Sequence, residues 1–401
     1  MRMELTSAES APERSEMRSL EVILGLLPLV LGLQLIIWLV YLPAALQGNA
    51  DFRNCYSTGL LLRSGRGHQI YDYAIQNDVQ TAFISRTATG MPYVHPAYEA
   101  LLFVPLSFLS YRYAFLCWLG LNLVCLLVSY RMLEKRFWPL REAWSYFPFL
   151  FTIAFAPFSV ALLQGQDSLI TLLLLSIALA NLESRNDLRA GLLVGLAAYK
   201  FQLVLPVAFL FFFWHKWRFV WGLCLSAFAA VIVSAIISGT QSLFSYVSYV
   251  REASVRFATL MPVQRMPNLR GLVSLLHLCP AVTFAFVLLL SLGVMALAAW
   301  SGRQISAARQ LAIAISAATL VGYHVMTHDL SILLIPIAVV LDEDSRRRLW
   351  IVPAVWLSTL LCFFGRDPFV ALALLALCSF QALRFRGLKV KLPTATPLGV
   401  S

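Results

Sequence analysis

The sequence has few charged residues: Asp, Glu, Lys and Arg together make up 13% of its 401 residues. Soluble domains carry about 25%, so this composition excludes an ordinary soluble globular protein. Apolar residues account for 60%, and the mean hydropathy is +0.76. Runs of about 20 apolar residues, each long enough to span about 30 Å of hydrocarbon, recur along the chain. These solid runs predict a polytopic all-α membrane protein rather than a β-barrel, whose strands alternate apolar and polar residues.

Several motifs of other protein classes are also missing. The seven cysteines occur singly, without a CxxC pair, which argues against a metal site or a disulfide framework. The sequence contains no P-loop, no Rossmann glycine pattern and no DxD-like nucleotide-sugar motif. No repeat of fixed period occurs, which argues against transporters built from duplicated halves. The net charge is +11, but the basic residues form short clusters beside apolar runs, which is typical of topology signals and lipid contacts rather than nucleic-acid binding.

The apolar runs predict about twelve membrane spans, in one domain over residues 22–385 with polar tails at 1–21 and 386–401. They include a short second span at 97–110 and a sixth span over 190–213. Two long polar loops interrupt the pattern, at residues 43–96 and 239–270. The first run is too long for a signal peptide and lacks a small-residue cleavage site, so we expect a retained span.

The basic residues of short loops predict the orientation. A cytoplasmic N-terminus and C-terminus place four basic clusters inside and one, at residues 131–141, outside. The same count places both long loops and residues 324–329 outside, and residues 164–167 inside. The four inner clusters are Lys216/Arg218, Arg303/Arg309, Arg346/Arg347/Arg348 and the tail Arg384/Arg386/Lys389/Lys391.

Asp51, at the start of the first long loop, is the main candidate for a catalytic residue. A carboxylate at the membrane surface, near Arg53 and Tyr56, is suited to deprotonate a sugar hydroxyl that attacks an anomeric carbon. The alternative is that Asp51 only caps the following helix. The apolar spacing from residue 52 to 60 predicts an amphipathic helix on the membrane surface, ended by Gly65, and a second one follows over 73–84.

Other polar residues in apolar surroundings are candidates for binding. Lys200 lies well inside an apolar stretch, and intramembrane cations usually mark function, here as a partner for a phosphate. The alternative is a helix break that places Lys200 at an interface. His324 and His328 are four positions apart and are expected to share a helix face and to bind substrate or lipid phosphate. HxxxH without a central glutamate is a weak zinc signal, and the two histidines could simply end two helices.

Two arginines of the second long loop, Arg265 and Arg270, are placed to meet a phosphate leaving group. Ordinary solvated loop arginines are the alternative. The segment from Gln164 to Asp167 breaks two apolar runs with amides and an acid, but its predicted inner location argues against a part in chemistry on the outer face.

Several segments, in order, resemble glycosyltransferase family 87 of the GT-C superfamily. Asp51, Tyr56 and the following LLLRSGRGHQIYD are similar to the family's first-loop pattern, and VHPAYEALLFVPL at 94–106 is similar to its next element. Gln164-Gly165-Gln166, the segment 190–200, PNLRG at 267–271 and HDL at 328–330 follow in the family's order, so the resemblance covers about residues 20–385. His95 stands where the family usually has Tyr, one proline of a pair is absent, and Glu99 is additional.

The resemblance implies a GT-C-type membrane bundle that acts as a polyprenyl-phosphate-mannose-dependent hexosyltransferase (EC 2.4.1 type). Such an enzyme moves a sugar, usually mannose, to a lipid or glycan acceptor on the outer face of the bacterial inner membrane. Asp51 is then the general base of an inverting reaction. No metal or cofactor is expected, because cationic side chains can stabilise a single phosphate leaving group. Residues expected to bind the donor or its phosphate are Lys200, Arg265, Arg270, His324, His328, Tyr56 and His95.

Two other functions stay open at this point. A transporter or flippase of lipid-linked saccharides would place polar residues at the membrane midplane of several spans, whereas only Lys200 stands clearly at depth. An inactive protein of the same fold is the third possibility. In each case the expected partners are lipid-linked sugars and membrane lipids, not nucleic acid.

Overall fold

The computed structural model describes residues 11–85, 90–256, 262–343 and 348–387, and within these ranges every regular element is a helix and none is a strand. This confirms the all-α prediction. The first nine α-helices are α1 (Ala11–Leu46), α2 (Phe52–Arg63), α3 (Tyr73–Phe83), α4 (Tyr111–Leu133), α5 (Trp138–Ala143), α6 (Phe147–Ile153), α7 (Ala156–Gln164), α8 (Ser168–Glu183) and α9 (Asp187–Leu196). The other nine are α10 (Phe201–Phe213), α11 (Trp217–Ser238), α12 (Thr240–Arg256), α13 (Leu269–Ser274), α14 (Pro280–Ser301), α15 (Ala307–Val321), α16 (Leu334–Leu341), α17 (Arg348–Ser358) and α18 (Val370–Gly387).

Five helical segments among the described residues are long and apolar enough to cross a membrane, which makes this an integral membrane protein. α6 and α7, bent by 48° at their junction, make a sixth if they form one broken span. Other apolar helices are only 10–17 residues long, so helix length does not confirm the expected number of about twelve spans. The five segments are Val22–Leu46, Tyr111–Ala143, Asp187–Phe213, Trp217–Ser238 and Pro280–Gln304.

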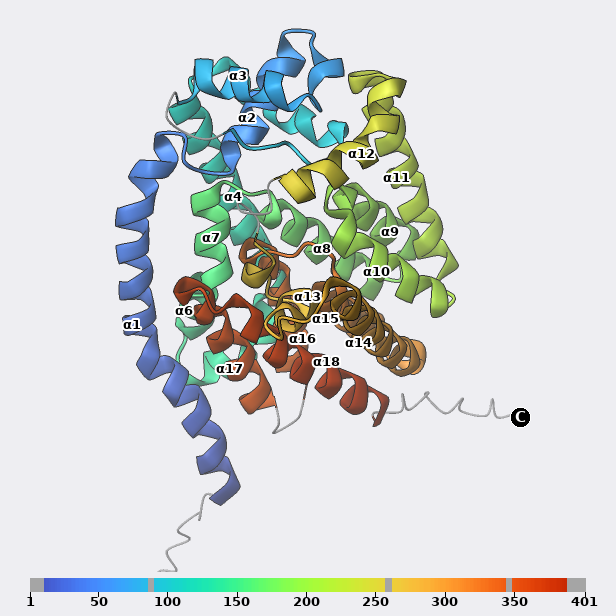
Figure 1. Ribbon diagram of the computed structural model, residues 1–401. Coiled ribbons are helices and arrows are strands. Elements are labelled where there is room, and N and C mark those ends of the chain that lie inside the picture. The colour runs from blue at the N-terminus through green and yellow to red at the C-terminus, as the bar shows by residue number, and fades with distance from the viewer. Residues whose placement is uncertain (1–10, 86–89, 257–261, 344–347, 388–401) are drawn as a thin grey trace, which may run out of the picture.

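The outer helices expose apolar side chains, as lipid-facing helices do. Only 11% of the most apolar stretch in α14 and 22% of that in α1 are buried inside the protein. In Figure 1, α1 runs along one side, α2, α3 and α12 gather toward the end drawn at the top, and α14 to α18 lie toward the bottom. α9 packs closely on α11, because glycines at 191 and 222 let the two backbones approach to a distance that no Cβ would allow.

One predicted span differs from the structure. Residues 97–110 form two short 3₁₀-helices, η2 (Ala97–Phe103) and η3 (Leu106–Phe108), which are too short to cross a membrane as one span. Pro105 separates them, since it has no N–H to continue the hydrogen-bond pattern. The predicted span at 190–213 agrees with the membrane-length segment Asp187–Phe213, although the 3₁₀-turn η5 (Ala197–Lys200) lies within it, between α9 and α10.

α2 does not lie on the surface as an amphipathic helix, so this prediction was wrong. All its residues from Phe52 to Leu61 are buried, against η2, α3 and α4. The apolar stripe packs around Phe52, whose ring contacts Phe103 and Trp118 at centroid distances of 6.1 Å, while the polar face is enclosed by neighbouring loops. The helix ends, as predicted, just before Gly65, which has a φ of +73°.

Candidate functional site

The site begins at the turn between α7 and α8, which contains Gln164 to Asp167. Gly165 has a φ of +63°, a left-handed conformation that favours glycine. A Cβ there would lie 2.7 Å from the Cβ of Phe52, and the carbonyl of Gly165 accepts a hydrogen bond of 2.8 Å from the Trp118 indole. The turn is therefore pressed against the beginning of α2.

This packing brings the two glutamines of the turn onto Asp51. The Gln166 amide donates a hydrogen bond of 2.6 Å to Oδ2 of Asp51, and the Asp51 backbone N–H donates one of 3.3 Å to Oε1 of Gln164. The prediction that residues 164–167 and Asp51 lie on opposite sides of the membrane was therefore wrong. The half-buried Asp51 side chain makes no capping hydrogen bond to α2, so helix capping, the alternative role, does not engage its carboxylate.

Lys200 lies between two carboxylates. Its Nζ is 2.7 Å from Oδ1 of Asp329 and 2.8 Å from Oδ1 of Asp167, and all three side chains are 2% exposed. The helix breaks at Lys200, as the alternative prediction had it, but the lysine is buried rather than exposed at an interface. An isolated buried ammonium would be very costly, and two close carboxylates compensate that cost.

Asp329 connects this ion cluster to the histidine segment. Its Oδ2 accepts a hydrogen bond of 3.0 Å from the Met326 N–H, and its Oδ1 lies 3.6 Å from Nε2 of His328. The predicted common helix face of His324 and His328 is wrong, because α15 ends at Val321 and the next helix, η8 (Thr327–Leu333), begins only after His324. Burial lowers the pKa of His324 to about 4, so this half-buried imidazole is neutral near pH 7.

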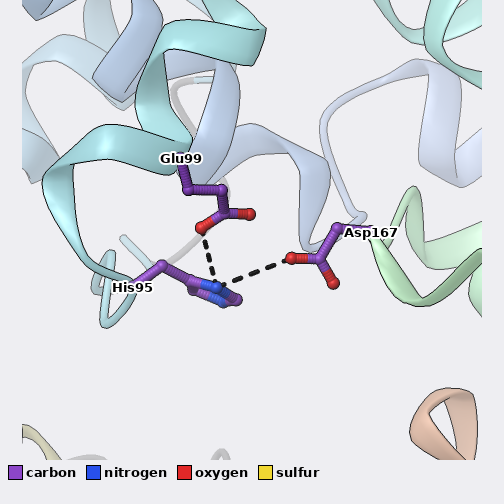
Figure 2. Close-up of side chains that lie close together, drawn as sticks. All are labelled: His95, Glu99 and Asp167. Carbon is purple, nitrogen blue, oxygen red and sulfur yellow. Dashed lines mark ion pairs between the residues drawn. The ribbon is translucent and has the colours of Figure 1, made fainter. Parts of the chain in front are cut away.

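His95, Glu99 and Asp167 form a second group that shares Asp167 with the ion cluster. Nδ1 of His95 lies 2.8 Å from Oε2 of Glu99 and 3.6 Å from Oδ2 of Asp167. Figure 2 shows the two carboxylates directed at the His95 ring from η2 and from the turn before α8. Burial raises the pKa of Glu99 to about 7, although the neighbouring His95 opposes this rise. Burial by itself would lower the pKa of His95, but the nearby carboxylates of Glu99 and Asp167 outweigh it, so the pKa of His95 is raised.

Arg265, Arg270 and Tyr56 lie around this centre rather than in it. Arg265 pairs with Asp367 at 2.9 Å, and Arg270 stacks on the ring of Tyr323, 4.0 Å from its centroid, and donates to the Tyr323 carbonyl. The Tyr56 hydroxyl donates a hydrogen bond of 2.7 Å to the carbonyl of Leu109. Through Tyr323, Arg270 lies beside the histidine segment, and the binding roles of all three residues stay predictions.

A polar hollow opens between the loop before α3 and α12, with a volume of about 330 Å³. Tyr71, Tyr249, Asp72 and Glu252 are among its lining residues. Tyr71 also donates a hydrogen bond of 3.0 Å to the carbonyl of His95, so the hollow borders the segment that carries the second group.

Sequence reasoning missed the convergence of Asp167, Glu99 and Gln166. One usable signal was the i, i+4 spacing of His95 and Glu99. Another was that Asp167 and Asp329 each stand at the start of an apolar helix, where the helix dipole favours an acid. Neither signal reveals that these starts meet at Lys200.

A comparison with family models found that the model of glycosyltransferase family 87 matches residues 93–336. The matched region contains His95, Glu99, Asp167, Lys200 and Asp329, and it begins after Asp51. No curated protein and no solved structure matched the chain.

Proposed function

We propose, from the premise that this chain belongs to glycosyltransferase family 87, that it transfers a hexose from a polyprenyl-phosphate donor to a lipid or glycan acceptor. The chain is a membrane glycosyltransferase by its family and its apolar helices. Beyond that, we propose that the hexose is mannose, that the site faces outward from the bacterial inner membrane, and that the reaction inverts the anomeric centre. The transfer itself needs no metal, since the leaving group is a single phosphate.

The observation that carries this proposal is the state of Asp51. Its carboxylate is half-buried, does not cap its helix and is oriented by the Gln166 amide at 2.6 Å. A general base must be held in place yet keep an oxygen for the acceptor proton. Gln166 contacts Oδ2, and no hydrogen bond or ion pair to Oδ1 is seen among the described residues. In our mechanism the acceptor oxygen bonds to the anomeric carbon while Oδ1 takes its proton. The bond between the anomeric carbon and the phosphate oxygen breaks at the same time, and polyprenyl phosphate leaves with that bond's electron pair.

The leaving phosphate requires positive charge or hydrogen-bond donors near Asp51. We assign these contacts to Arg270, His324 and His328. Arg270 stacks on Tyr323, the neighbour of His324 in the chain, and the charge of Asp51 is one of those that act on His328. Lys200 is already held by Asp167 and Asp329 at 2.8 and 2.7 Å. In our proposal Lys200 holds these two carboxylates in place. Through Asp329 it also positions the histidine segment, in addition to any contact with phosphate.

We place the acceptor sugar in the hollow beside Tyr71 and Tyr249. Ligand sites combine apolar and aromatic walls with a few polar groups that fix orientation. Tyrosine rings supply faces for a sugar ring, and the carboxylates of Asp72 and Glu252 supply acceptors for its hydroxyls. Three other residues were predicted to bind substrate: Arg265, Tyr56 and His95. They stay in the proposal as residues at the border of the phosphate-binding region or of the hollow.

The test is a transfer assay with purified protein in lipid nanodiscs, radiolabelled polyprenyl-phosphate-mannose and membrane-lipid acceptors. The wild type is expected to form a labelled product, and Asp51→Asn is expected to lower the rate by about 10² to 10⁴-fold, the usual contribution of a general base. Asp51→Asn keeps the size of the side chain, so the thermal unfolding temperature should change little.

The exposed Asp78, on α3 of the same loop, provides a matched control as Asp78→Asn. Full turnover by Asp51→Asn would refute the base assignment. Movement of the labelled lipid across vesicles without any transfer product would favour a flippase, and neither movement nor transfer would favour an inactive member of the fold.

A further inference from the structure

His95, Glu99 and Asp167 present three donor atoms to a common point. One ligand atom from each residue lies within 4.8 Å of the other two, and Nδ1 of His95 is 2.8 Å from Oε2 of Glu99. In a tetrahedral site with bonds of about 2.1 Å, ligand atoms are separated by about 3.4 Å. The three side chains therefore need only small rotations to enclose one ion.

The charges in this region are unbalanced. Three acidic residues, Glu99, Asp167 and Asp329, are at most 3% exposed. Asp167 and Asp329 pair with a single lysine, Lys200, and Glu99 lies against His95 beside Asp167. Buried charges need compensation by opposite charge or by coordination to a metal. In the deprotonated form in which His95 and Glu99 bind a metal, the group carries a net charge of −2, from three acids and one lysine, which a divalent cation would neutralise.

The oxygens on the His95 side of the cluster also lack hydrogen bonds. Among the described residues, no donor group is hydrogen-bonded to the buried Oε1 of Glu99 or Oδ2 of Asp167, and the two carboxyl groups are close enough to hydrogen-bond each other when one of them holds a proton. Asp167 divides its contacts: Oδ1 meets Lys200 at 2.8 Å, while Oδ2 faces His95 at 3.6 Å. Buried carboxylate oxygens that receive no hydrogen bond from a donor group and face an imidazole nitrogen are typical of metal ligands.

The surroundings resemble the outer shell of a metal site. The Tyr93 hydroxyl donates a hydrogen bond of 3.2 Å to Oε2 of Glu99, and Lys200 holds the second oxygen of Asp167. Such partners orient metal ligands and adjust their basicity. His95 and Glu99 come from one short segment and Asp167 from a turn far along the chain, so an ion here would tie η2 to the start of α8.

We propose that His95, Glu99 and Asp167 bind a divalent cation through one nitrogen and two carboxylate oxygens. This donor set suits Zn²⁺ or Mn²⁺ better than Ca²⁺, which prefers six to eight oxygen ligands, or Mg²⁺, which prefers oxygen and water. The ion holds the 90–103 segment against the turn that carries Gln166, and so positions the partner of Asp51. The site stands on its own geometry and does not depend on which sugar or acceptor the protein uses.

The experiment measures metal content and stability rather than turnover. Untagged full-length protein, purified in detergent without chelators, is analysed by inductively coupled plasma mass spectrometry, then stripped and titrated with Zn²⁺, Mn²⁺, Mg²⁺ or Ca²⁺ alone. We expect close to one equivalent of zinc or manganese per chain, and an unfolding temperature that rises by about 4 °C when that metal is returned to the stripped protein.

Variants locate the site. Glu99→Gln and His95→Gln keep side-chain size and are expected to weaken metal affinity by more than the roughly 10 to 100-fold that follows loss of an outer partner, whereas Tyr93→Phe should fall within that range. His68→Ala and Asp78→Asn remove exposed groups of the same kinds and should leave affinity unchanged.

The proposal would be overturned if the purified protein contained no metal and its unfolding temperature did not change with any of the four ions. His95, Glu99 and Asp167 would then be a cluster that shares a proton. Undiminished binding by both Glu99→Gln and His95→Gln would also overturn it. If either variant fails to fold, Tyr93→Phe and the metal content of the wild type still decide the question.

Discussion

Two clusters in this protein each hold one basic side chain between two acids, and they clamp the same two helices at opposite ends. At one end, Lys200 joins Asp167, which precedes α8, to Asp329, in the turn that leads into α16. At the other, Arg136 joins the last residue of α8 to the residue after α16, Glu183 and Asp342.

The clusters differ in their access to water. All three side chains around Lys200 are 2% exposed, whereas those around Arg136 are 16, 45 and 42% exposed. An exposed ion pair is worth about 0–1 kcal/mol, while taking charges out of water costs several kcal/mol per ion before their attraction offsets it. A protein that only needed to clamp α8 to α16 would do so with apolar residues. The buried cluster therefore indicates function, and the exposed one a modest contact.

The helix dipoles add to the contrast. Asp167 and Asp329 stand at helix N-termini, where a negative charge is favoured, and Glu183 and Asp342 stand at C-termini, where it is not. Arg136 offsets an unfavourable placement, whereas Lys200 joins two favourable ones. The two clusters thus have similar charges, but only the cluster around Lys200 places its acids where the helix dipoles favour them.

The largest effect on stability is expected from Lys200→Met. It leaves two buried carboxylates without their cation, and breaking a buried pair in this way costs about 3–5 kcal/mol. Thermal unfolding in detergent should show a large drop in Tm that added salt does not change, because buried charges are poorly screened. A triple variant, Lys200→Met with Asp167→Asn and Asp329→Asn, should recover much of the loss. A triple variant no more stable than the single one would contradict this account.

A smaller effect is expected from lowering the pH, through His324 beside the buried cluster. Its folded pKa, about 4, lies below the usual 6.5 because burial disfavours the charged form. The unfolded chain therefore binds more protons between pH 6.5 and pH 4, so stability falls as pH is lowered through that window.

The measurement is Tm at pH 7 and pH 5 for the wild type and for His324→Gln, with His215→Gln, at an exposed position, as the control for removal of an imidazole. The wild type should lose about 2 °C more than His324→Gln. Equal losses in the two proteins would show that His324 is protonated equally in both states.

The smallest effect is expected from Arg136→Ala in the exposed cluster. Loss of its two surface pairs should lower the free energy of unfolding by at most about 1 kcal/mol. The difference from wild type should shrink further at 1 M salt, where the Debye length is about 3 Å. Urea unfolding at two salt concentrations measures both values. A loss as large as that of Lys200→Met would remove the distinction between the two clusters.

Much of the secondary structure could be predicted from the sequence, because it depends on local patterns. The apolar runs predict the helices, Gly65 the end of α2, and the stretch at 73–84 the helix α3, which begins after Asp72 with a hydrogen bond of 3.2 Å from the Ile75 N–H. Predictions that needed the surroundings of a helix were less successful. α2 was expected on the surface because its stripe is amphipathic, yet aromatic packing encloses it.

Residue patterns alone are enough to predict an all-helical membrane protein with an acid at position 51, after the first apolar run, and a lysine inside a later one. The contacts of these two residues depend on the tertiary structure. Asp51 contacts Gln166, 115 positions away, and Lys200 contacts Asp329, 129 positions away. Such pairings depend on how helices pack and turn relative to one another, and local residue patterns do not encode that geometry. Burial, which makes a charge costly or useful, is likewise a property of the packed bundle.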